Sequence, residues 1–272
     1  MITLDNIGKE YNKKTVLRDI SMTIEQGQSI AFTGHNGCGK STLLKIIAGL
    51  VQPTKGKVNY ERSFLFHYVP EHFPKMQLTA ENYLFSQGKM DGIEEKELRE
   101  RIQSLSGDFF FESMLKKPMK CLSKGSLQKV GVIQALLKNP DILLLDEPLS
   151  GQDIASQQVF IDKINMLRKK GVVILMSCHE PYLIDAISDC VYRLDDGVLT
   201  LVNQRNTKEK TWYVLIFTNG DQCFVPERWK GHLQYIENGC RLRVEEDDCN
   251  IVCMEMLQAG WNLRGMLNES DM

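Results

Sequence analysis

A glycine-rich segment that ends in a lysine and two hydroxyl residues is the clearest site of potential chemistry in the chain. This segment, GHNGCGKST (residues 34–42), fits the pattern G-x-x-x-x-G-K-[ST]. It lies between a predicted strand, QSIAFTG, and a predicted helix that begins STLLKIIAGL, which is the context that the pattern requires. Glycines allow backbone N–H groups to curve around phosphate oxygens, and the helix N-terminus adds partial positive charge. The segment therefore predicts a phosphate-binding loop.

Two residues of this loop have specific expected roles. The Lys40 ammonium is expected to reach the β- and γ-phosphates of a nucleoside triphosphate, and the Ser41 hydroxyl to ligate Mg²⁺. The expected ligands are accordingly ATP and Mg²⁺. The loop residues predicted to bind the nucleotide are Gly34, His35, Asn36, Gly37, Cys38, Gly39, Lys40, Ser41 and Thr42.

A second acidic motif follows an apolar run, in the segment DILLLDEP (residues 141–148). Its apolar residues predict a buried strand, and the terminal Asp146 carboxylate can hold Mg²⁺ through water. Glu147 then lies at the carboxyl end of the strand, where open α/β sheets bind their ligands. Alone, such an acidic pair is usually a turn. Beside a phosphate loop, it makes Glu147 the candidate to polarise an attacking water.

A third motif, LSKGSLQK (residues 122–129), resembles the signature L-S-G-G-Q of ATP-binding cassette (ABC) ATPases and opens a predicted helix. It departs from that consensus at Lys124 and Ser126. The resemblance implies that two nucleotide-binding domains pair head to tail. The signature of one domain then closes over the γ-phosphate held by the other, as a second helix N-terminus aimed at an anion. The residues implied in this contact are Ser123, Gly125 and Ser126.

Further residues match the pattern of the same family, in the expected order along the chain. Tyr11 stands where the family places an aromatic side chain that stacks on adenine, an interaction of about 1–3 kcal/mol. The segment SGQD (residues 150–153) matches the loop that crosses the dimer interface, with Asp153 as its acid and Gln152 in place of an apolar residue. His179 follows a buried strand and matches the switch histidine that contacts the γ-phosphate.

The segment YVPEHFP (residues 68–74) carries a departure from the family pattern, because Glu71 replaces the usual glutamine. In the family this side chain reaches Mg²⁺ and the attacking water, and it links the site to the membrane partner. A carboxylate would bind Mg²⁺ more strongly but would repel the γ-phosphate and Glu147. The alternative interpretation is a solvated loop acid after a strand-ending proline.

The elements around these motifs predict an α/β fold: a P-loop cassette with a helical insertion, followed by a small α+β appendage. Apolar strands alternate with helices up to about residue 200, which is typical of a parallel sheet with crossover helices. The cassette is expected over residues 1–205, with a helical subdomain at about 72–138. A polar stretch at 203–210 is a candidate linker, and residues 211–272 are predicted to form the appendage.

Composition restricts the class of protein. The 272 residues are 43% hydrophobic and carry a formal net charge of −2, so no nucleic-acid partner is expected. The longest apolar runs are strand-length, far below the roughly 20 residues of a membrane span. Eight cysteines without a Cys-x-x-Cys pair and no export signal indicate the reducing cytosol. The expected location is therefore cytoplasmic, peripheral on the inner face of the cell membrane through a partner.

The resemblance implies the ATPase subunit of a membrane transporter, acting as a homodimer with a separate integral-membrane permease. The Pro-Glu pair, the LSKG segment and the short appendage resemble ATPase subunits of exporters. Two alternatives stay open. One is a soluble cassette ATPase in iron–sulfur cluster assembly or another non-transport role. The other is a regulatory module that binds ATP without hydrolysis, against which Glu147 and His179 both argue.

Overall fold

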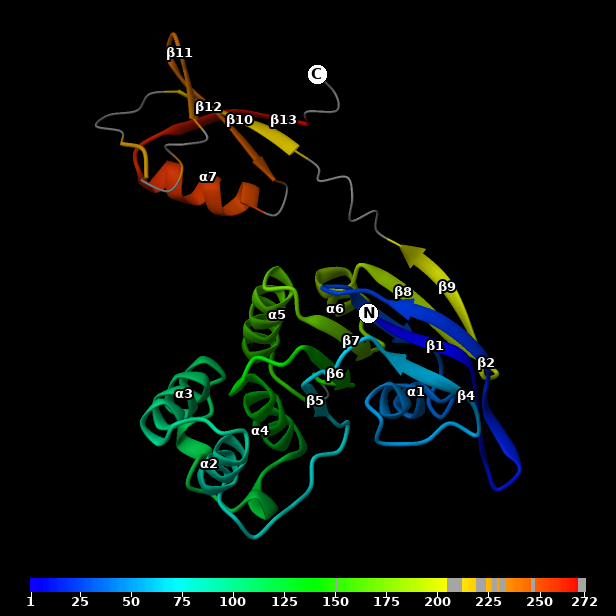
Figure 1. The fold of residues 1–272 in the computed structure, drawn as a ribbon. Helices are drawn as coiled ribbons and strands as arrows, with labels where there is room; N and C mark the ends of the chain where they lie inside the picture. Colours follow the sequence, from blue (N-terminus) through cyan, green and yellow to red (C-terminus); the bar gives the residue numbers. More distant parts are fainter. Residues whose placement is uncertain are drawn as a thin grey trace. The chain divides into compact units, whose positions relative to one another are not determined.

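The computed structural model describes most of the chain (Figure 1). The described residues are 1–149, 151–204, 212–218, 224–226, 229, 233–245 and 248–268. Internal contacts divide the chain into two compact units, residues 1–205 and 206–272. Ser150 and residues 205–210 of the predicted linker lie outside the described residues.

A six-stranded, mostly parallel sheet forms the centre of the first unit and positions the motifs. Its order is β5-β6-β7-β3-β8-β9, and its last pair, β8 and β9, is antiparallel. Strands β6 and β7 are buried along their whole length, as their continuous apolar runs predict. The strands are β3 (Ser29–Thr33), β5 (Phe66–Val69), β6 (Ile142–Asp146), β7 (Val173–Ser177), β8 (Cys190–Asp195) and β9 (Val198–Gln204).

An antiparallel sheet of order β2-β1-β4 packs on one side of this centre (Figure 1). Helix α1 (Lys40–Ile47) lies in the core between the two sheets, where Leu43 and Leu44 meet Ile142 and Leu144 of β6. Because side chains alternate along a strand, Ile142 and Leu144 face α1 while their neighbours face the other side. The strands of this sheet are β1 (Ile2–Tyr11), β2 (Lys14–Ile24) and β4 (Lys55–Tyr60).

Helices cover the opposite face of the central sheet and extend into a helical region (Figure 1). Thr79 caps the first of them through a hydrogen bond from the Asn82 N–H, as its position predicts. Glu94 caps the next through Lys96 N–H and Glu97 N–H. The elements are α2 (Ala80–Met90), α3 (Glu95–Asp108), η1 (Glu112–Met114), η2 (Met119–Cys121), α4 (Lys124–Leu136), α5 (Ile154–Lys169) and α6 (Pro181–Ile187).

In its described residues, the second unit is an antiparallel sheet of order β11-β12-β10-β13 with helix α7 packed on it. Phe217 of the sheet and Val252 and Met256 of the helix belong to its core. The sequence predicts an aspartate N-cap for this helix. Asp248 occupies that position, although its side chain accepts no capping hydrogen bond, and Asp247 lies outside the described residues. The elements are β10 (Trp212–Thr218), β11 (Leu233–Ile236), β12 (Gly239–Glu245), α7 (Cys249–Gln258) and β13 (Asn262–Asn268).

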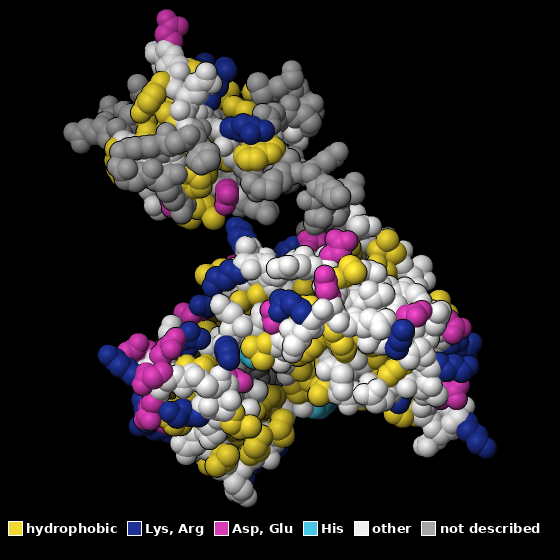
Figure 2. All heavy atoms as spheres, viewed as in Figure 1, with side chains coloured by type: hydrophobic (Ala, Val, Ile, Leu, Met, Phe, Trp, Pro, Cys, Tyr) yellow, Lys and Arg dark blue, Asp and Glu magenta, His cyan; other side chains and the backbone are white. Residues whose placement is uncertain are grey.

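Among the described residues, no helix has both the length and the apolar character needed to cross a membrane. Charged side chains of both signs are interspersed over the visible surface of α3, where Arg99 and Arg101 pair with Glu95 and Glu97 (Figure 2).

Candidate functional site

The glycine-rich segment connects β3 to the N-terminus of α1. Gly34, Gly37 and Gly39 have φ angles of 135°, 83° and 114°, which L side chains rarely adopt. A Cβ atom at Gly34 would lie 2.2 Å from the carbonyl oxygen of Leu194, so a side chain cannot fit there. The loop is therefore a backbone cradle of the kind that binds phosphate.

The other residues of the loop differ in their exposure to solvent. The segment His35–Gly37 is exposed, whereas Cys38, Gly39 and Lys40 are buried and Ser41 and Thr42 are half-buried. The buried thiol of Cys38 lies against Gly34, because a Cβ added to Gly34 would come within 2.9 Å of the Cys38 sulfur. Cys38 thus packs beneath the loop.

The Lys40 ammonium is held over this cradle by neutral groups. Its Nζ donates to the carbonyl oxygens of Gly34 at 2.8 Å and His35 at 3.3 Å, and it contacts His179 Nε2 at 3.0 Å. None of these three partners is a carboxylate, so the buried positive charge is not neutralised by a direct contact. A phosphate in the cradle would supply the missing negative charge, and the loop therefore fits a nucleoside triphosphate.

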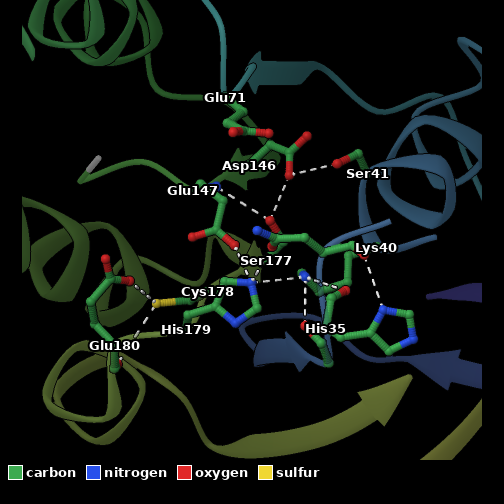
Figure 3. Close-up of polar contacts among 12 residues, drawn as sticks. His35, Lys40, Ser41, Glu71, Asp146, Glu147, Ser177, Cys178, His179 and Glu180 are labelled. Carbon is green, nitrogen blue, oxygen red and sulfur yellow. Dashed lines mark hydrogen bonds and ion pairs between the residues drawn. The ribbon is translucent and has the colours of Figure 1, made fainter. Parts of the chain in front are cut away.

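Asp146 ends β6 as a buried carboxylate, 3% exposed, surrounded by hydroxyl donors. Its Oδ1 accepts from Ser41 Oγ at 3.0 Å and from Ser177 Oγ at 2.5 Å (Figure 3). Its Oδ2 accepts from Tyr68 OH at 3.0 Å. Burial, followed by the charge of Asp146, raises the pKa of Tyr68, so this phenol remains a donor.

The oxygens around Asp146 also fit a magnesium ion. Ser41 Oγ and Asp146 Oδ1 lie 3.0 Å apart at the end of the phosphate cradle. Mg²⁺ prefers oxygen ligands and usually takes one or two from the protein, with water and substrate phosphates completing its shell. The described residues contain no group of three or more His, Cys, Asp or Glu side chains that could hold a metal ion.

Glu147 lies on the turn after β6 with a positive φ of 49°, a conformation uncommon for a residue with a side chain. Its N–H group approaches both the carbonyl oxygen of Ser177 at 3.1 Å and Ser177 Oγ at 3.2 Å. Burial raises the pKa of the Glu147 carboxyl to about 7, with the charges of Glu180, Asp146 and Glu71 adding to the effect and that of Lys40 opposing it. Such a carboxylate suits a general base near neutral pH.

His179 joins these groups from the segment after β7. Its Nε2 lies 3.1 Å from Glu147 Oε1, 3.0 Å from Lys40 Nζ and 3.0 Å from Asn36 Oδ1 (Figure 3). Burial, followed by the charge of Lys40, lowers the pKa of His179, so the imidazole is neutral near pH 7. The structure thus gathers the Lys40 ammonium, the Asp146 and Glu147 carboxylates and the His179 imidazole beside one glycine-rich loop.

Comparison with known proteins agrees with this geometry. A family model described as ABC transporter matches residues 17–150. The ABC transporter ATP-binding protein NatA of Bacillus subtilis (strain 168) is 32% identical over 213 residues, which cover 72% of this chain and 87% of NatA. The chain belongs to the ABC transporter ATPase family. Subunits of this family are ATPases that power transport.

Two further matches extend the comparison. The zinc import ATP-binding protein ZnuC of Hydrogenovibrio crunogenus (strain DSM 25203 / XCL-2) is 32% identical over 199 residues, covering 68% of this chain and 74% of that protein. A solved ATP-binding cassette, described as a dimeric post-hydrolysis state bound to ADP and Pi, has a TM-score of 0.68. It is 22% identical and covers 75% of this chain and 99% of that one.

Glu71 of this ABC ATPase follows β5 and is half-buried, with its side chain 42% exposed. Figure 3 shows its carboxylate directed toward Asp146. Its charge contributes to the raised pKa of Glu147, and its Oε1 also lies 3.6 Å from His72 Nδ1. This placement favours the interpretation of Glu71 as a residue of the site over that of a fully solvated loop acid.

The signature segment forms the start of α4 in the ABC ATPase. Ser123 caps the helix by accepting from the Ser126 N–H at 3.1 Å. A Cβ at Gly125 would lie 2.0 Å from the carbonyl oxygen of Gly151, so the signature packs directly on the loop that precedes α5. Asp153 caps α5 and pairs with Lys129 of α4 at 2.8 Å, a hydrogen bond that lowers the pKa of Asp153.

These contacts of the signature are made with α4, α5 and the loop before α5. The described partners of Ser123, Gly125, Ser126 and Asp153 belong to α4, α5 and the loop before α5, and none belongs to the phosphate loop. The contact of these residues with nucleotide remains a prediction. Tyr11 ends β1 with an exposed ring, and the Lys9 ammonium lies 4.8 Å from its centroid. Its predicted adenine contact remains a prediction.

Sequence reasoning missed two residues of the site, Tyr68 and Ser177. Tyr68 appears in the sequence as one apolar residue of a strand, and Ser177 as the last residue of another. One signal for Ser177 was available, because it ends a buried strand that is adjacent to and parallel with the strand of Asp146. Asp146 and Ser177 are paired in register on these two strands.

Proposed function

We propose that this ABC ATPase binds Mg-ATP, pairs with a second copy of itself and drives a separate integral-membrane permease. The observation that carries the proposal is the convergence of Lys40, Asp146, Glu147 and His179 beside one phosphate cradle. They come from three separate segments of the chain, since Asp146 and Glu147 are consecutive, and strands β3, β6 and β7 bring these segments to one edge of the sheet.

The proposed reaction assigns each side chain a distinct role. The loop N–H groups and Lys40 bind the β- and γ-phosphates, and Ser41 and Asp146 would hold Mg²⁺, which neutralises phosphate charge when bound. Glu147 accepts a proton from the attacking water as it approaches the γ-phosphate. His179 holds Glu147 in place and orients it, and it faces the γ-phosphate together with Lys40.

Closure of the proposed site requires a second copy. Ser123, Gly125 and Ser126 at the N-terminus of α4 would contact the γ-phosphate bound by the partner, and the loop that ends at Asp153 would cross the interface. The dimeric form of the related cassette bound to ADP and Pi supports this arrangement. Hydrolysis would then reopen the homodimer.

The permease is proposed to contact the helical region. Leu78 before α2 and Phe110 after α3 are exposed apolar side chains there, and Figure 2 shows apolar side chains gathered on this part of the cassette unit. Such surface groups suit a protein partner. The cassette would then lie on the cytoplasmic face of the membrane, attached through the permease.

Export is the direction we propose, on the resemblance of the Pro-Glu pair and the LSKG segment to exporter subunits. Relatives named for zinc import show that importers share a comparable degree of identity, so identity alone does not favour either direction. The alternative function is a soluble cassette in iron–sulfur cluster assembly, which would also need one cassette and the same nucleotide site.

The decisive experiment is purification of the tagged full-length chain from its native membrane, with identification of the co-purifying protein. A polytopic membrane protein that raises the ATPase rate on reconstitution is the expected result. Co-purification with soluble cluster-assembly factors would favour the alternative. Transport into inside-out vesicles, with right-side-out vesicles as the matched control, then determines the direction.

A further inference from the structure

The Asp146 carboxylate is held by hydroxyl groups from three separate elements. Ser41 from α1 and Ser177 from β7 donate to its Oδ1, and Tyr68 from β5 donates to its Oδ2. The phosphate-loop motif accounts for Ser41 but for neither of the others. Tyr68 and Ser177 therefore need an explanation of their own.

The two donors act on opposite oxygens of one carboxylate. The terminal torsion of an aspartate is broad, so a carboxylate held at one oxygen can still rotate. Bonds to Tyr68 on Oδ2 and Ser177 on Oδ1 fix the plane of the group. They also leave Oδ1 as the oxygen that lies beside Ser41, where the metal would bind.

Each donor also comes from a strand that leads into another part of the site. Strand β5 ends at Val69, and the next residue is Pro70. The Pro70 carbonyl oxygen accepts a hydrogen bond from the buried Gln128 side chain of α4 at 3.1 Å. Ser177 directly precedes Cys178 and His179, and it also receives the N–H of Glu147. The orientation of Asp146 is thereby tied to both neighbouring strands.

We propose that Tyr68 and Ser177 are positioning residues that orient the Asp146 carboxylate for magnesium in the nucleotide complex. The proposal rests on the proposed function, because it assumes that Asp146 faces Mg-ATP. Partners that orient metal ligands typically change metal affinity 10- to 100-fold when they are removed. Loss of the Tyr68 hydroxyl should therefore weaken the magnesium-dependent part of nucleotide binding and leave the magnesium-independent part unchanged.

The test compares Tyr68→Phe with Tyr83→Phe in the full-length chain. Tyr83 provides a matched control, since its hydroxyl donates to Gln134 Oε1 at 2.7 Å in the helical region and its ring is also partly buried. The probe is a fluorescent ribose-labelled ATP, whose affinity is measured in EDTA and then across a magnesium titration. The melting temperature of each variant reports how much stability is lost with the hydrogen bond of one tyrosine hydroxyl.

For Tyr68→Phe we expect unchanged affinity in EDTA and a magnesium requirement raised about 10-fold. Tyr83→Phe should match the parent in both measurements. A magnesium titration of Tyr68→Phe that overlays the parent, or an equal loss of affinity in EDTA, overturns the inference. If the parent chain itself does not bind the probe with magnesium, the proposed function fails first and the inference fails with it.

Ser177 supplies an independent second pair of variants, which keeps the test decisive if Tyr68→Phe does not fold. Ser177→Ala should also raise the magnesium requirement, whereas Ser177→Thr retains the hydroxyl and should recover most of the parent behaviour. Equal magnesium profiles for the alanine and threonine variants overturn the role of the hydroxyl.

Discussion

Glu147 Oε1 and His179 Nε2 lie 3.1 Å apart, although the two residues come from different strand ends. The contact follows from the sheet, because β6 and β7 are parallel neighbours with Asp146 and Ser177 in register. Burial raises the pKa of Glu147 to about 7, and burial together with Lys40 lowers the pKa of His179. The Glu147 carboxyl and the His179 imidazole therefore have closer proton affinities than these two groups usually have.

Glu147→Gln should abolish turnover while leaving nucleotide binding intact. The amide retains the size of the side chain but cannot accept the proton of the attacking water, and loss of a general base typically costs about 10²- to 10⁴-fold in rate. With Mg-ATP the variant should accumulate as a closed dimer, detectable by size-exclusion chromatography. Glu180→Gln is the control, because Glu180 also bears a charge near His179 but accepts from the Cys178 thiol. A parent-like rate for Glu147→Gln would remove it as the base.

The ATPase rate should fall on the acid side with a midpoint near pH 7. A general base works only when deprotonated, so kcat/KM rises with pH as the buried Glu147 loses its proton. The other charges near Glu147 are those of Glu180, Asp146 and Glu71, which raise its pKa, and that of Lys40, which lowers it. His179 faces it and is neutral in this range.

Glu71→Gln should shift that acid midpoint to lower pH. The substitution removes one negative charge that raises the pKa of Glu147, so the base deprotonates more readily. The measurement is the pH profile of kcat/KM for the parent and the variant at saturating magnesium. An identical midpoint would show that Glu71 is screened by solvent, and the same variant should then also leave the magnesium dependence of turnover unchanged.

The site residues that belong to sequence motifs were predictable, because each motif specifies its own local backbone geometry. Lys40 and Ser41 belong to a turn whose glycines specify it, and Asp146 and Glu147 end a strand that apolar composition identifies. The buried parallel strands and the helices after Thr79 were predictable for the same reason, since periodicity and caps are local signals.

The remaining contacts depend on register between distant segments, which composition does not encode. Tyr68 and Ser177 reach Asp146 from 78 and 31 positions away, and Lys129 reaches Asp153 from 24 positions away. The aspartate predicted before α7 is present at the N-cap position, but the side-chain bond is not, for a related reason. An aspartate before a helix is typical of a cap, but the backbone there is αR rather than extended, so the carboxylate does not meet the helix N–H groups.

Gly125→Ala should destabilise the chain and impair ATP hydrolysis. The added Cβ would lie 2.0 Å from the carbonyl oxygen of Gly151, a backbone atom that cannot move aside cheaply. Overpacking of this kind costs about 1–3 kcal/mol. Gly107→Ala in α3 is the control, because its Cβ would make only an ordinary contact with Glu112 at 3.6 Å. Alanine favours helix over glycine at both sites. An equal fall in melting temperature in both variants would therefore contradict the steric clash predicted at Gly125.

The Lys129–Asp153 pair should stabilise the chain more than a surface pair does. The Lys129 side chain is 11% exposed and Asp153 is 56% exposed, so removal of Asp153 leaves a largely buried ammonium with the Phe109 carbonyl. Asp153→Asn should lower the free energy of unfolding by about 1–2 kcal/mol, a range reduced for the solvent that reaches Asp153. Glu95→Gln, which breaks an exposed pair with Arg99, should cost no more than about 0.5 kcal/mol.

The pH dependence of this pair separates a true charge contact from a lost cap. Its hydrogen bond from Lys129 lowers the pKa of Asp153 in the folded chain, so the pair contributes fully above the unfolded carboxyl pKa of about 4. The contribution is lost only as pH falls through the lower folded-state pKa. The difference in unfolding free energy between parent and Asp153→Asn, measured with urea, should therefore be constant from about pH 6 to 8 and shrink below about pH 4.

Lys129→Met tests the same contact from its other side: in that background Asp153→Asn should cost only its share as the cap of α5. A cost equal to that in the parent would show that the two side chains are not coupled.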